Sequence, residues 1–313
     1  MPEEKMNTPT LSIVIPVFNE QEAITELFSA LAKLEKSFPT DIEVILVDDG
    51  STDHTLEKIK SLDLPYKKQT ISLSRNFGHQ AALVAGLEAS SGEIVVTMDG
   101  DLQHPPALIP EMLKQHAEGV DIVFTRRIDT NAISLEKKMT SGMFYSLINR
   151  FSGTKIERNG SDFRSLNRKA LTALLSMPEK RKFLRGMVSW IGFKTIVLPF
   201  TVQERAAGKS KYTLFKMMRL ALSGITSFST FPLYLSAFFG AGLFIAAVIY
   251  ALYVLYIRFF AGGIVQGWAS VLFVLLIVGG FLSLFIGVIG LYVAAIYDEV
   301  KNRPIYFIKE VNG

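Results

Sequence analysis

The sequence contains no cysteine, so it has neither a disulfide framework nor thiolate chemistry. This absence is compatible with a reducing compartment. The first ten residues, MPEEKMNTPT, also lack the apolar core of a secretory signal. We therefore expect the hydrophilic part of the chain to remain in the compartment where it is synthesised.

Acidic and basic side chains are almost absent from residues 231–297, where Arg258 is the single exception. Two apolar runs in this region, 233–257 and 269–297, each exceed the roughly 20 residues that a helix needs to cross the hydrocarbon core. Tyrosine and tryptophan lie near the ends of these runs, as is typical of a membrane interface. We predict two transmembrane helices, with buried core helices of a soluble protein as the alternative.

The charges that flank the two runs predict their orientation. Cations precede the first run and follow the second, whereas the connecting loop offers only Arg258. By the positive-inside rule, both termini and the hydrophilic part face the cytoplasm, which predicts a multi-pass protein of the cytoplasmic (inner) membrane. The flanking cations are Lys209, Lys211, Lys216, Arg219, Lys301, Arg303 and Lys309.

Residues 213–230 combine Lys216 and Arg219 with apolar neighbours directly before the first run. This pattern favours an amphipathic helix in the headgroup plane, and the alternative is that the segment simply begins the first transmembrane helix. We thus predict three parts: a cytoplasmic domain over 1–212, an interfacial helix over 213–230, and a membrane part over 231–313 that ends in a short cytoplasmic tail.

The first part of the chain alternates short β-branched apolar runs with helical patterns. Such alternation predicts right-handed βαβ units around a mostly parallel sheet, and therefore an α/β fold. Asn19 is the expected N-cap of the first helix, and Asp53 is expected to be an acid at the N-terminus of the second helix. Strands are expected within 11–17, 42–51, 68–74, 93–99 and 121–127.

Four aspartates lie at the carboxyl ends of two of these strands: Asp48 and Asp49 at one, Asp99 and Asp101 at another. In sheets of this kind, ligands gather at the carboxyl ends of the strands. The topology alone therefore predicts a site that contains all four carboxylates.

Asp99 and Asp101 stand one residue apart, and two carboxylates this close cost free energy unless a cation, a proton or a turn compensates. Asp-Gly favours a hairpin, but the Leu-Gln-His-Pro-Pro that follows does not resemble a returning strand. An EF-hand would need further acids and a distal glutamate, and a plain solvated loop stays open. The remaining interpretation is that Asp99 and Asp101 bind one divalent cation together with substrate phosphates. Both carboxylates can reach the same ion because residues i and i+2 of an extended segment lie on one face.

Several motifs occur together and in order: SIVIPVFNE, VILVDDGSTDHT, LSRNFGHQAALVAGL and VVTMDGDLQHPP. They resemble the GT-A glycosyltransferases of family 2, which use nucleotide sugars. The later SDFRSLNRKAL and ERAAGKSKY, followed by two apolar runs, resemble the polyprenyl-phosphate branch of that family, which includes bactoprenol glucosyltransferases and dolichol-phosphate mannose synthases. The resemblance covers essentially the whole chain and makes residues 1–212 the GT-A catalytic domain.

The resemblance implies a metal-dependent enzyme that transfers a hexose, with inversion, from a nucleotide sugar to polyprenyl (undecaprenyl) phosphate. It further implies Mg²⁺ or Mn²⁺ as cofactor, and a flippase and a glycan transferase that act downstream in cell-envelope glycan modification such as that of O-antigen. The roles implied are nucleotide-sugar binding for Pro16, Asn19, Glu20, Asp48, Asp49 and Asp99; metal binding for Asp99, Asp101 and Gln103; catalysis for Asp101, Asp162 and Arg164; and phosphate or acceptor binding for Arg127, Arg205, Ser210 and Lys211.

Other choices remain open at this level. UDP-glucose is the preferred donor, but GDP-mannose, UDP-galactose, or a modified arabinose or hexosamine would require few changes in the motifs. His79 and His104 are next to the motifs, but no third potential metal ligand clusters with them in the sequence. A direct role of either histidine in the site is therefore the less favoured hypothesis. Asp162 is expected to orient the acceptor more than to deprotonate it, since a lipid phosphate is already ionised. A homo-oligomer stays open.

Three rival functions are less favoured. A processive polysaccharide synthase would carry Q-x-x-R-W, and neither Trp190 nor Trp268 follows an arginine. Two transmembrane helices are too few to line the transport path of a transporter. The net charge of +4 is only mildly basic, and no patch interleaves aromatic residues with cations, so no nucleic-acid partner is expected.

Overall fold

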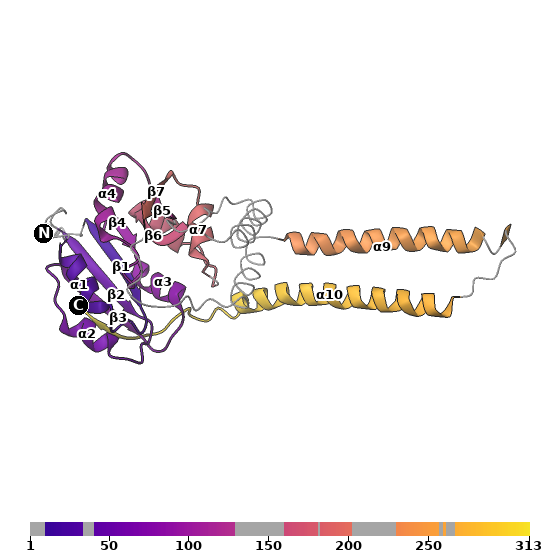
Figure 1. The fold of residues 1–313 in the computed structure, drawn as a ribbon, viewed down its shortest axis with the longest axis horizontal. Helices are drawn as coiled ribbons and strands as arrows, with labels where there is room; N and C mark the ends of the chain where they lie inside the picture. The colour runs from indigo at the N-terminus through magenta and orange to yellow at the C-terminus, as the bar shows by residue number, and fades with distance from the viewer. Residues whose placement is uncertain are drawn as a thin grey trace, which may run out of the picture. The chain divides into compact units, whose positions relative to one another are not determined.

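The computed structural model describes residues 10–33, 41–128, 160–180, 182–201, 230–256, 259–260 and 267–313. The chain divides into two compact units (Figure 1). The first, here the sheet unit, comprises residues 1–149, 153–212 and 303–313, and the second, the helical unit, comprises 150–152 and 213–302.

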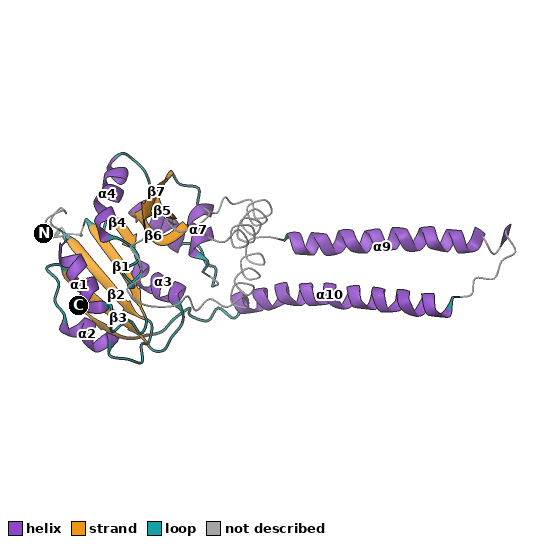
Figure 2. Cartoon of the chain, viewed as in Figure 1, coloured by secondary structure: helices purple, strands orange, loops and turns teal. Residues whose placement is uncertain are grey.

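The sheet unit is built on one eight-stranded sheet in the order β7-β5-β6-β4-β1-β2-β3-β8, flanked by helices (Figure 2). Strands β1 to β4 are parallel to their neighbours among them, β5 and β7 are parallel, and β6 and β8 run antiparallel to theirs. The predicted α/β fold with a mostly parallel sheet is therefore confirmed. The strands are β1 (Leu11–Val17), β2 (Ile42–Asp48), β3 (Lys67–Leu73), β4 (Ile94–Thr97), β5 (Ile122–Ile128), β6 (Gly160–Asn167), β7 (Thr195–Thr201) and β8 (Ile308–Asn312).

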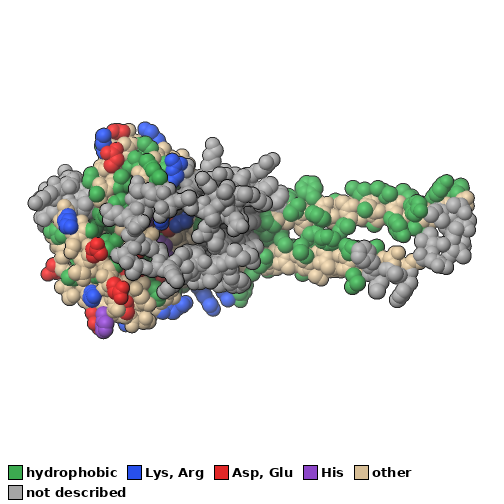
Figure 3. All heavy atoms as spheres, in the orientation of Figure 1, with side chains coloured by type: hydrophobic (Ala, Val, Ile, Leu, Met, Phe, Trp, Pro, Cys, Tyr) green, Lys and Arg blue, Asp and Glu red, His purple; other side chains and the backbone are tan. Residues whose placement is uncertain are grey.

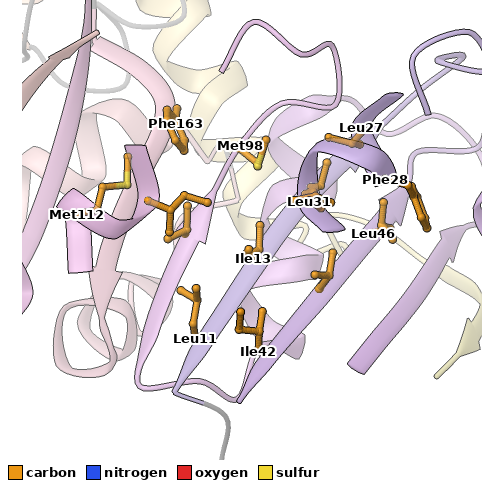
Figure 4. Packing of buried hydrophobic residues seen from close by; sticks show 14 of the residues in the cluster. Leu11, Ile13, Leu27, Phe28, Leu31, Ile42, Leu46, Met98, Met112 and Phe163 are labelled. Atoms are coloured by element: carbon orange, nitrogen blue, oxygen red, sulfur yellow. The ribbon is translucent and has the colours of Figure 1, made fainter. Parts of the chain in front are cut away.

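The helices of the sheet unit cover a continuous apolar core (Figure 4). Every residue of β1 and β2 is buried, as expected for central strands covered on both faces. Helix α3 approaches β1 so closely that a Cβ on Gly86 would lie 2.3 Å from Cγ1 of Val14. This contact fixes α3, whose first residue lies in the site described below. The helices are α1 (Ile24–Ala32), α2 (Thr55–Ser61), α3 (His79–Ala89), α4 (Ile109–Ala117), α6 (Arg168–Leu175) and α7 (Leu184–Trp190), with a 3₁₀ turn at Pro106–Leu108.

The start of α1 differs from the prediction. Helix α1 begins at Ile24 with Ala23 at its N-cap, so the assignment of Asn19 as N-cap was wrong. Asn19 instead adopts a left-handed backbone conformation with φ of 54° in the loop after β1. The prediction for Asp53 is confirmed, because its carboxylate accepts the N–H of Thr55, the first residue of α2, at 3.0 Å.

The C-terminal residues also differ from the expected tail of the membrane part. Residues 303–313 belong to the sheet unit, where β8 pairs antiparallel with β3. Strand β8 carries Lys309 and Glu310 and is largely exposed. Its sequence therefore lacks the clear alternation of apolar and polar residues that predicts a strand. The chain therefore returns to the sheet after its last long helix.

The helical unit contains α9 (Phe231–Tyr256) and α10 (Trp268–Val300). The segments Pro232–Tyr256 and Val274–Val300 are long and apolar enough to cross a membrane, and their windows have no buried share. Figure 3 shows their hydrophobic side chains on the surface of both helices. The two predicted apolar helices are confirmed as helices that could span a membrane. The interfacial helix predicted over 213–230 falls outside the described residues except for its last residue, Thr230.

Candidate functional site

The carboxyl ends of β1, β2 and β4 bring the predicted acidic segments to one edge of the sheet. Val17 pairs with Asp48 in the β1–β2 register, and the N–H of Asp49 donates to the carbonyl of Val17 at 2.9 Å. Asp99 and Asp101 follow β4 on the other side of β1. The topology-based prediction of where these carboxylates gather therefore agrees with the structure.

The loops after β1 and β2 are joined by hydrogen bonds. Asn19 donates its backbone N–H to Oγ of Ser51 at 3.0 Å and accepts the N–H of Thr52 on Oδ1 at 2.9 Å. The N–H of Glu20 donates to Oγ1 of Thr55 at 2.9 Å. Pro16 lies inside buried β1. The predicted nucleotide-binding roles of Pro16, Asn19 and Glu20 remain predictions, and the loops that present Asn19 and Glu20 are preorganised.

Asp48 and Asp49 are buried and already engaged. The two oxygens of Asp49 accept the N–H groups of Phe77 at 2.8 Å and Gly78 at 2.9 Å, which fixes the loop between β3 and α3. Asp48 accepts the N–H of Ser51 at 3.2 Å. Burial raises the pKa of Asp49, and the two backbone hydrogen bonds oppose that shift. Asp49 is thus a support for the site.

Replacing Asp49 by asparagine tests that support. The substitution turns one acceptor oxygen into an NH₂ group facing a backbone N–H, so we expect the sheet unit to lose about 1–3 kcal/mol of stability. Thermal unfolding of the full chain in detergent measures the loss. An unchanged melting temperature with weaker nucleotide-sugar binding would instead make Asp49 a ligand residue only.

The backbone of Asp99 is held by His104. The N–H of Asp99 donates to Nδ1 of His104 at 2.9 Å, so this nitrogen carries no proton. The other ring nitrogen lies 2.6 Å from Oγ of Ser161, and burial lowers the pKa of His104 to about 4. The ring also stacks on Phe163 with centroids 5.1 Å apart. His104 is therefore a neutral structural residue, and its proximity to the Asp99 carboxylate (3.7 Å) is not an ion pair.

The Asp99 side chain is unusual. Its Oδ1 atom is buried and has no hydrogen-bond partner among the described residues. Nε2 of His79 lies 3.4 Å from that oxygen without forming a hydrogen bond. Burial raises the pKa of Asp99, and the neighbouring His79 opposes the shift. A buried carboxylate oxygen left unpaired costs free energy unless a ligand or ion completes it.

Asp101, Gln103 and Arg127 form a chain of side chains beside Asp99. Oδ1 of Asp101 accepts the N–H of Gln103 at 3.1 Å, and Oδ2 accepts its Nε2 at 2.5 Å. The Oε1 atom of Gln103 lies 3.4 Å from Nη1 of Arg127. Leu102 between them has a left-handed φ of 62°, which turns the loop so that Asp101 and Gln103 meet. The structure thus brings together three residues that the sequence predicted for metal and phosphate binding.

Asp162 on β6 is the centre of a cationic cluster. Its Oδ1 accepts hydrogen bonds from Nη2 of Arg164 and, at 3.0 Å, from Nε of Arg185. Its Oδ2 accepts Nη2 of Arg185 at 2.8 Å and lies 3.6 Å from Nε2 of His79. Burial raises the pKa of Asp162, but His79, Arg164 and Arg185 outweigh burial and hold the pKa well below its usual value. A carboxylate held in this way is a weak base, which supports an orienting role.

Arg164 and Arg185 occupy different positions in this cluster. The Arg164 side chain is buried, and its Nη1 lies 3.5 Å from the carbonyl of Leu184. The N–H of Leu184 donates to Oε1 of Gln80 at 3.2 Å, so the start of α7 is held from two sides. Arg185, the next residue, is 40% exposed. Arg164 is therefore a buried partner of Asp162, whereas Arg185 lies at the surface of the site.

Sequence reasoning missed Arg185 altogether and gave His79 little weight. Arg185 stands in a seven-residue helix without a motif, and only the fold brings it to Asp162. His79 directly follows the RNFG segment and begins α3, which was the one available signal. Burial lowers the pKa of His79, but Asp162 and Asp99 outweigh burial and hold it above the ordinary value. The predicted Arg205, Ser210 and Lys211 lie outside the described residues.

The residues present fit a divalent cation held jointly with a substrate. No group of three or more His, Cys, Asp or Glu side chains that could hold a metal occurs among the described residues. Mg²⁺, however, is commonly bound through one or two carboxylates together with substrate phosphates. Asp99, whose buried oxygen has no hydrogen-bond partner within the described ranges, and Asp101 supply two such carboxylates two residues apart. The remaining oxygens would come from a phosphorylated substrate.

Comparisons with known proteins agree with this geometry. The profile of Glycosyl transferase family 2 matches residues 12–175. The chain is 37% identical over 303 residues to the uncharacterized glycosyltransferase YkcC of Bacillus subtilis (strain 168), covering 96% of this chain and 94% of that protein. It is 39% identical over 303 residues to the SfII prophage-derived bactoprenol glucosyl transferase of Shigella flexneri, covering 96% and 97%. A prophage bactoprenol glucosyl transferase homolog of Escherichia coli (strain K12) is 37% identical over 302 residues, covering 96% and 99%. The profile spans more than half of the chain and these relatives match nearly all of it, so the family predicted from the motifs is confirmed: the chain belongs to glycosyl transferase family 2.

Proposed function

We propose that this protein transfers a hexose, with glucose from UDP-glucose as the first choice, to a polyprenyl phosphate such as undecaprenyl phosphate. The observation that carries the proposal is the buried oxygen of Asp99, which has no hydrogen-bond partner in the described part of the chain and lies beside Asp101 at the ligand-binding edge of a family 2 fold. The names of the relatives, bactoprenol glucosyl transferases, support the acceptor and the sugar. The two apolar helices support an acceptor that resides in a membrane.

In the proposed reaction, a phosphate oxygen of the lipid attacks the anomeric carbon and forms the new C–O bond. The bond from that carbon to the nucleoside diphosphate breaks on the opposite side, so the configuration inverts and the diphosphate leaves with the bonding electrons. Asp99, Asp101 and Gln103 would hold Mg²⁺ or Mn²⁺, which when bound offsets negative charge on the diphosphate.

No general base is required, because the acceptor phosphate is ionised at neutral pH. Asp162 accordingly orients His79 and Arg185 instead of accepting a proton. Arg185 at the surface of the cluster can bind a phosphate oxygen while its Nε and Nη2 remain on Asp162. Asn19, Glu20, Asp48 and the β1 residue Pro16 are proposed to line the nucleotide pocket, and Arg127, Arg205, Ser210 and Lys211 to bind phosphate.

The proposed setting is the cytoplasmic membrane. The cations that flank α9 and α10 favour both termini and the sheet unit on the cytoplasmic side. Donor and lipid phosphate would then meet on that side. A flippase and a glycan transferase would then act on the lipid-linked sugar.

A donor panel tests the proposal. Purified full-length protein is incubated with undecaprenyl phosphate, Mg²⁺ or Mn²⁺ and, one at a time, UDP-glucose, UDP-galactose, GDP-mannose, and UDP-linked arabinose and hexosamine derivatives. Mass spectrometry of the lipid fraction is expected to show an undecaprenyl-phosphate hexose with UDP-glucose. Transfer from another member of the panel would change the sugar and keep the reaction class, and absence of any lipid product would contradict the proposal.

A further inference from the structure

We infer that the segment after α10 is a part of the catalytic apparatus, in which Phe307 positions His79. The inference rests on the proposed sugar transfer for its kinetic consequence, and on contacts within the sheet unit for its structure. It assigns a positioning role to a residue that is more than 220 positions away from His79 in the sequence.

The segment is anchored to the sheet unit at several points. In the β3–β8 pairing, Leu73 lies opposite Ile308, and the N–H of Ser74 donates to the carbonyl of Phe307 at 2.9 Å. Nζ of Lys60 on α2 lies 2.7 Å from Oε2 of Glu310. The hydroxyl of Tyr306 donates to Glu88 on α3. The segment therefore contacts β3 and the helices α2 and α3 on either side of it in the sequence.

Phe307 reaches the loop that precedes α3. Its ring packs against Phe77 with centroids 6.2 Å apart and planes tilted by 52°. The guanidinium of Arg75 lies 4.3 Å from the centroid of Phe77, so this ring has a cation over it as well. The side chain of Phe77 is thereby held by two partners, one of which comes from the C-terminal segment.

The backbone of the same loop is held by Asp49, which accepts the N–H groups of Phe77 and Gly78. Gly78 has a φ of 99°, a conformation that L side chains rarely adopt, and it is the N-cap of α3. His79 follows at once. The loop turns sharply and is held both at the Phe77 ring and at its backbone by Asp49, so the His79 imidazole has little freedom to change position. Release of the Phe77 ring would therefore shift His79.

The position of His79 matters because its Nε2 lies 3.4 Å from Oδ1 of Asp99 and 3.6 Å from Oδ2 of Asp162. It is the side chain that joins the proposed metal carboxylate to the cationic cluster. A displacement of about 1 Å in such a constellation can cost up to about a hundredfold in rate. The contacts of Phe307 within the described residues are with Phe77 and Ser74, which lie outside the reacting groups, so Phe307 is a positioning residue.

The test compares three variants of the full-length protein. Phe307→Ala removes the ring, and Phe307→Tyr keeps it. Val311→Ala is a matched control on β8, since Val311 is also half exposed but pairs with Ile71 within β3. We expect Phe307→Ala to lower kcat by about ten- to a hundredfold, with a donor KM within about twofold of wild type. Phe307→Tyr and Val311→Ala should retain wild-type kcat.

A second readout does not depend on activity. The chain has four histidines, so the His79 ring resonance can be assigned by His79→Gln in a ¹³C-histidine-labelled sample. At fixed pH it should move in Phe307→Ala and stay in place in the other two variants. An unmoved resonance together with wild-type kcat in Phe307→Ala would overturn the inference, as would equal losses in Phe307→Ala and Val311→Ala. If wild type transfers no sugar to lipid phosphate, the proposed function fails while the resonance still decides the role of Phe307.

Discussion

Asp101→Ala is expected to abolish sugar transfer, with a loss of about a thousandfold or more. A bound divalent ion supplies several kcal/mol of charge stabilisation in the transition state, and each 1.36 kcal/mol corresponds to about tenfold in rate. Asp101 offers both of its oxygens at the proposed metal position and orients Gln103 through them. The measurement is incorporation of labelled sugar into the lipid fraction, alongside membrane insertion, which should be unchanged.

Two controls sharpen this prediction. Asp101→Asn keeps the shape of the side chain and an acceptor for the Gln103 N–H but removes the charge, so it should be nearly as inactive as the alanine variant. Asp63→Ala removes an exposed carboxylate elsewhere on the sheet unit and should leave activity unchanged. EDTA should abolish sugar transfer by the wild-type protein, and added Mg²⁺ or Mn²⁺ should restore the activity. Full activity of the wild type in EDTA would contradict the metal role.

Asp162→Ala is expected to destabilise the sheet unit by about 3–5 kcal/mol, in addition to lowering activity. The substitution leaves the guanidinium of Arg164 buried with the carbonyl of Leu184 as its remaining partner in the hydrogen bonds described above. Removing one member of a buried pair is far more costly than removing both. The double variant Asp162→Ala/Arg164→Met should therefore regain much of the lost stability while remaining inactive.

Fluorescence of Trp190 on α7 reports this unfolding in a Trp268→Phe background, because the chain has only two tryptophans. The pKa of Asp162 is held well below its usual value of 3.8, so its contribution is fully present above that value. The stability difference between wild type and Asp162→Ala should consequently persist from pH 8 to pH 5 and shrink only in stronger acid. It should be larger at pH 5 than at pH 8, because Asp162 also holds the pKa of His79 above its ordinary value. A difference that vanishes near pH 6 would contradict the ion-pair account.

Local patterns predicted the parts of the fold and site that depend on a few neighbouring residues. The buried strands β1, β2 and β4 are short runs rich in β-branched apolar residues, and the two apolar helices exceed the length of a membrane span. Asp99 and Asp101 follow directly from such a strand. Their positions at the ligand-binding edge are a consequence of parallel topology, which the alternation of strands and helices already indicated.

Features that depend on long-range contacts could not be predicted in the same way. Nothing in the sequence around Asp49 predicts that its two carboxylate oxygens accept the backbone N–H groups of residues 77 and 78. Strand β8 is charged and exposed, and only its pairing with β3 makes it a strand. Asp162 and Arg164 are different: in a strand, residues i and i+2 share a face, so their pairing could have been derived from GSDFRSLN once that segment was assigned as β6.

The central claim is that the acceptor is a phosphate, which makes a general base unnecessary. The most direct measurement compares undecaprenyl phosphate with undecaprenol as acceptors for purified protein, with the donor selected in the panel and Mg²⁺ or Mn²⁺ present. The account predicts a lipid-linked sugar from undecaprenyl phosphate and none from undecaprenol. Transfer to undecaprenol at a comparable rate, or to a soluble acceptor and not to undecaprenyl phosphate, would contradict it.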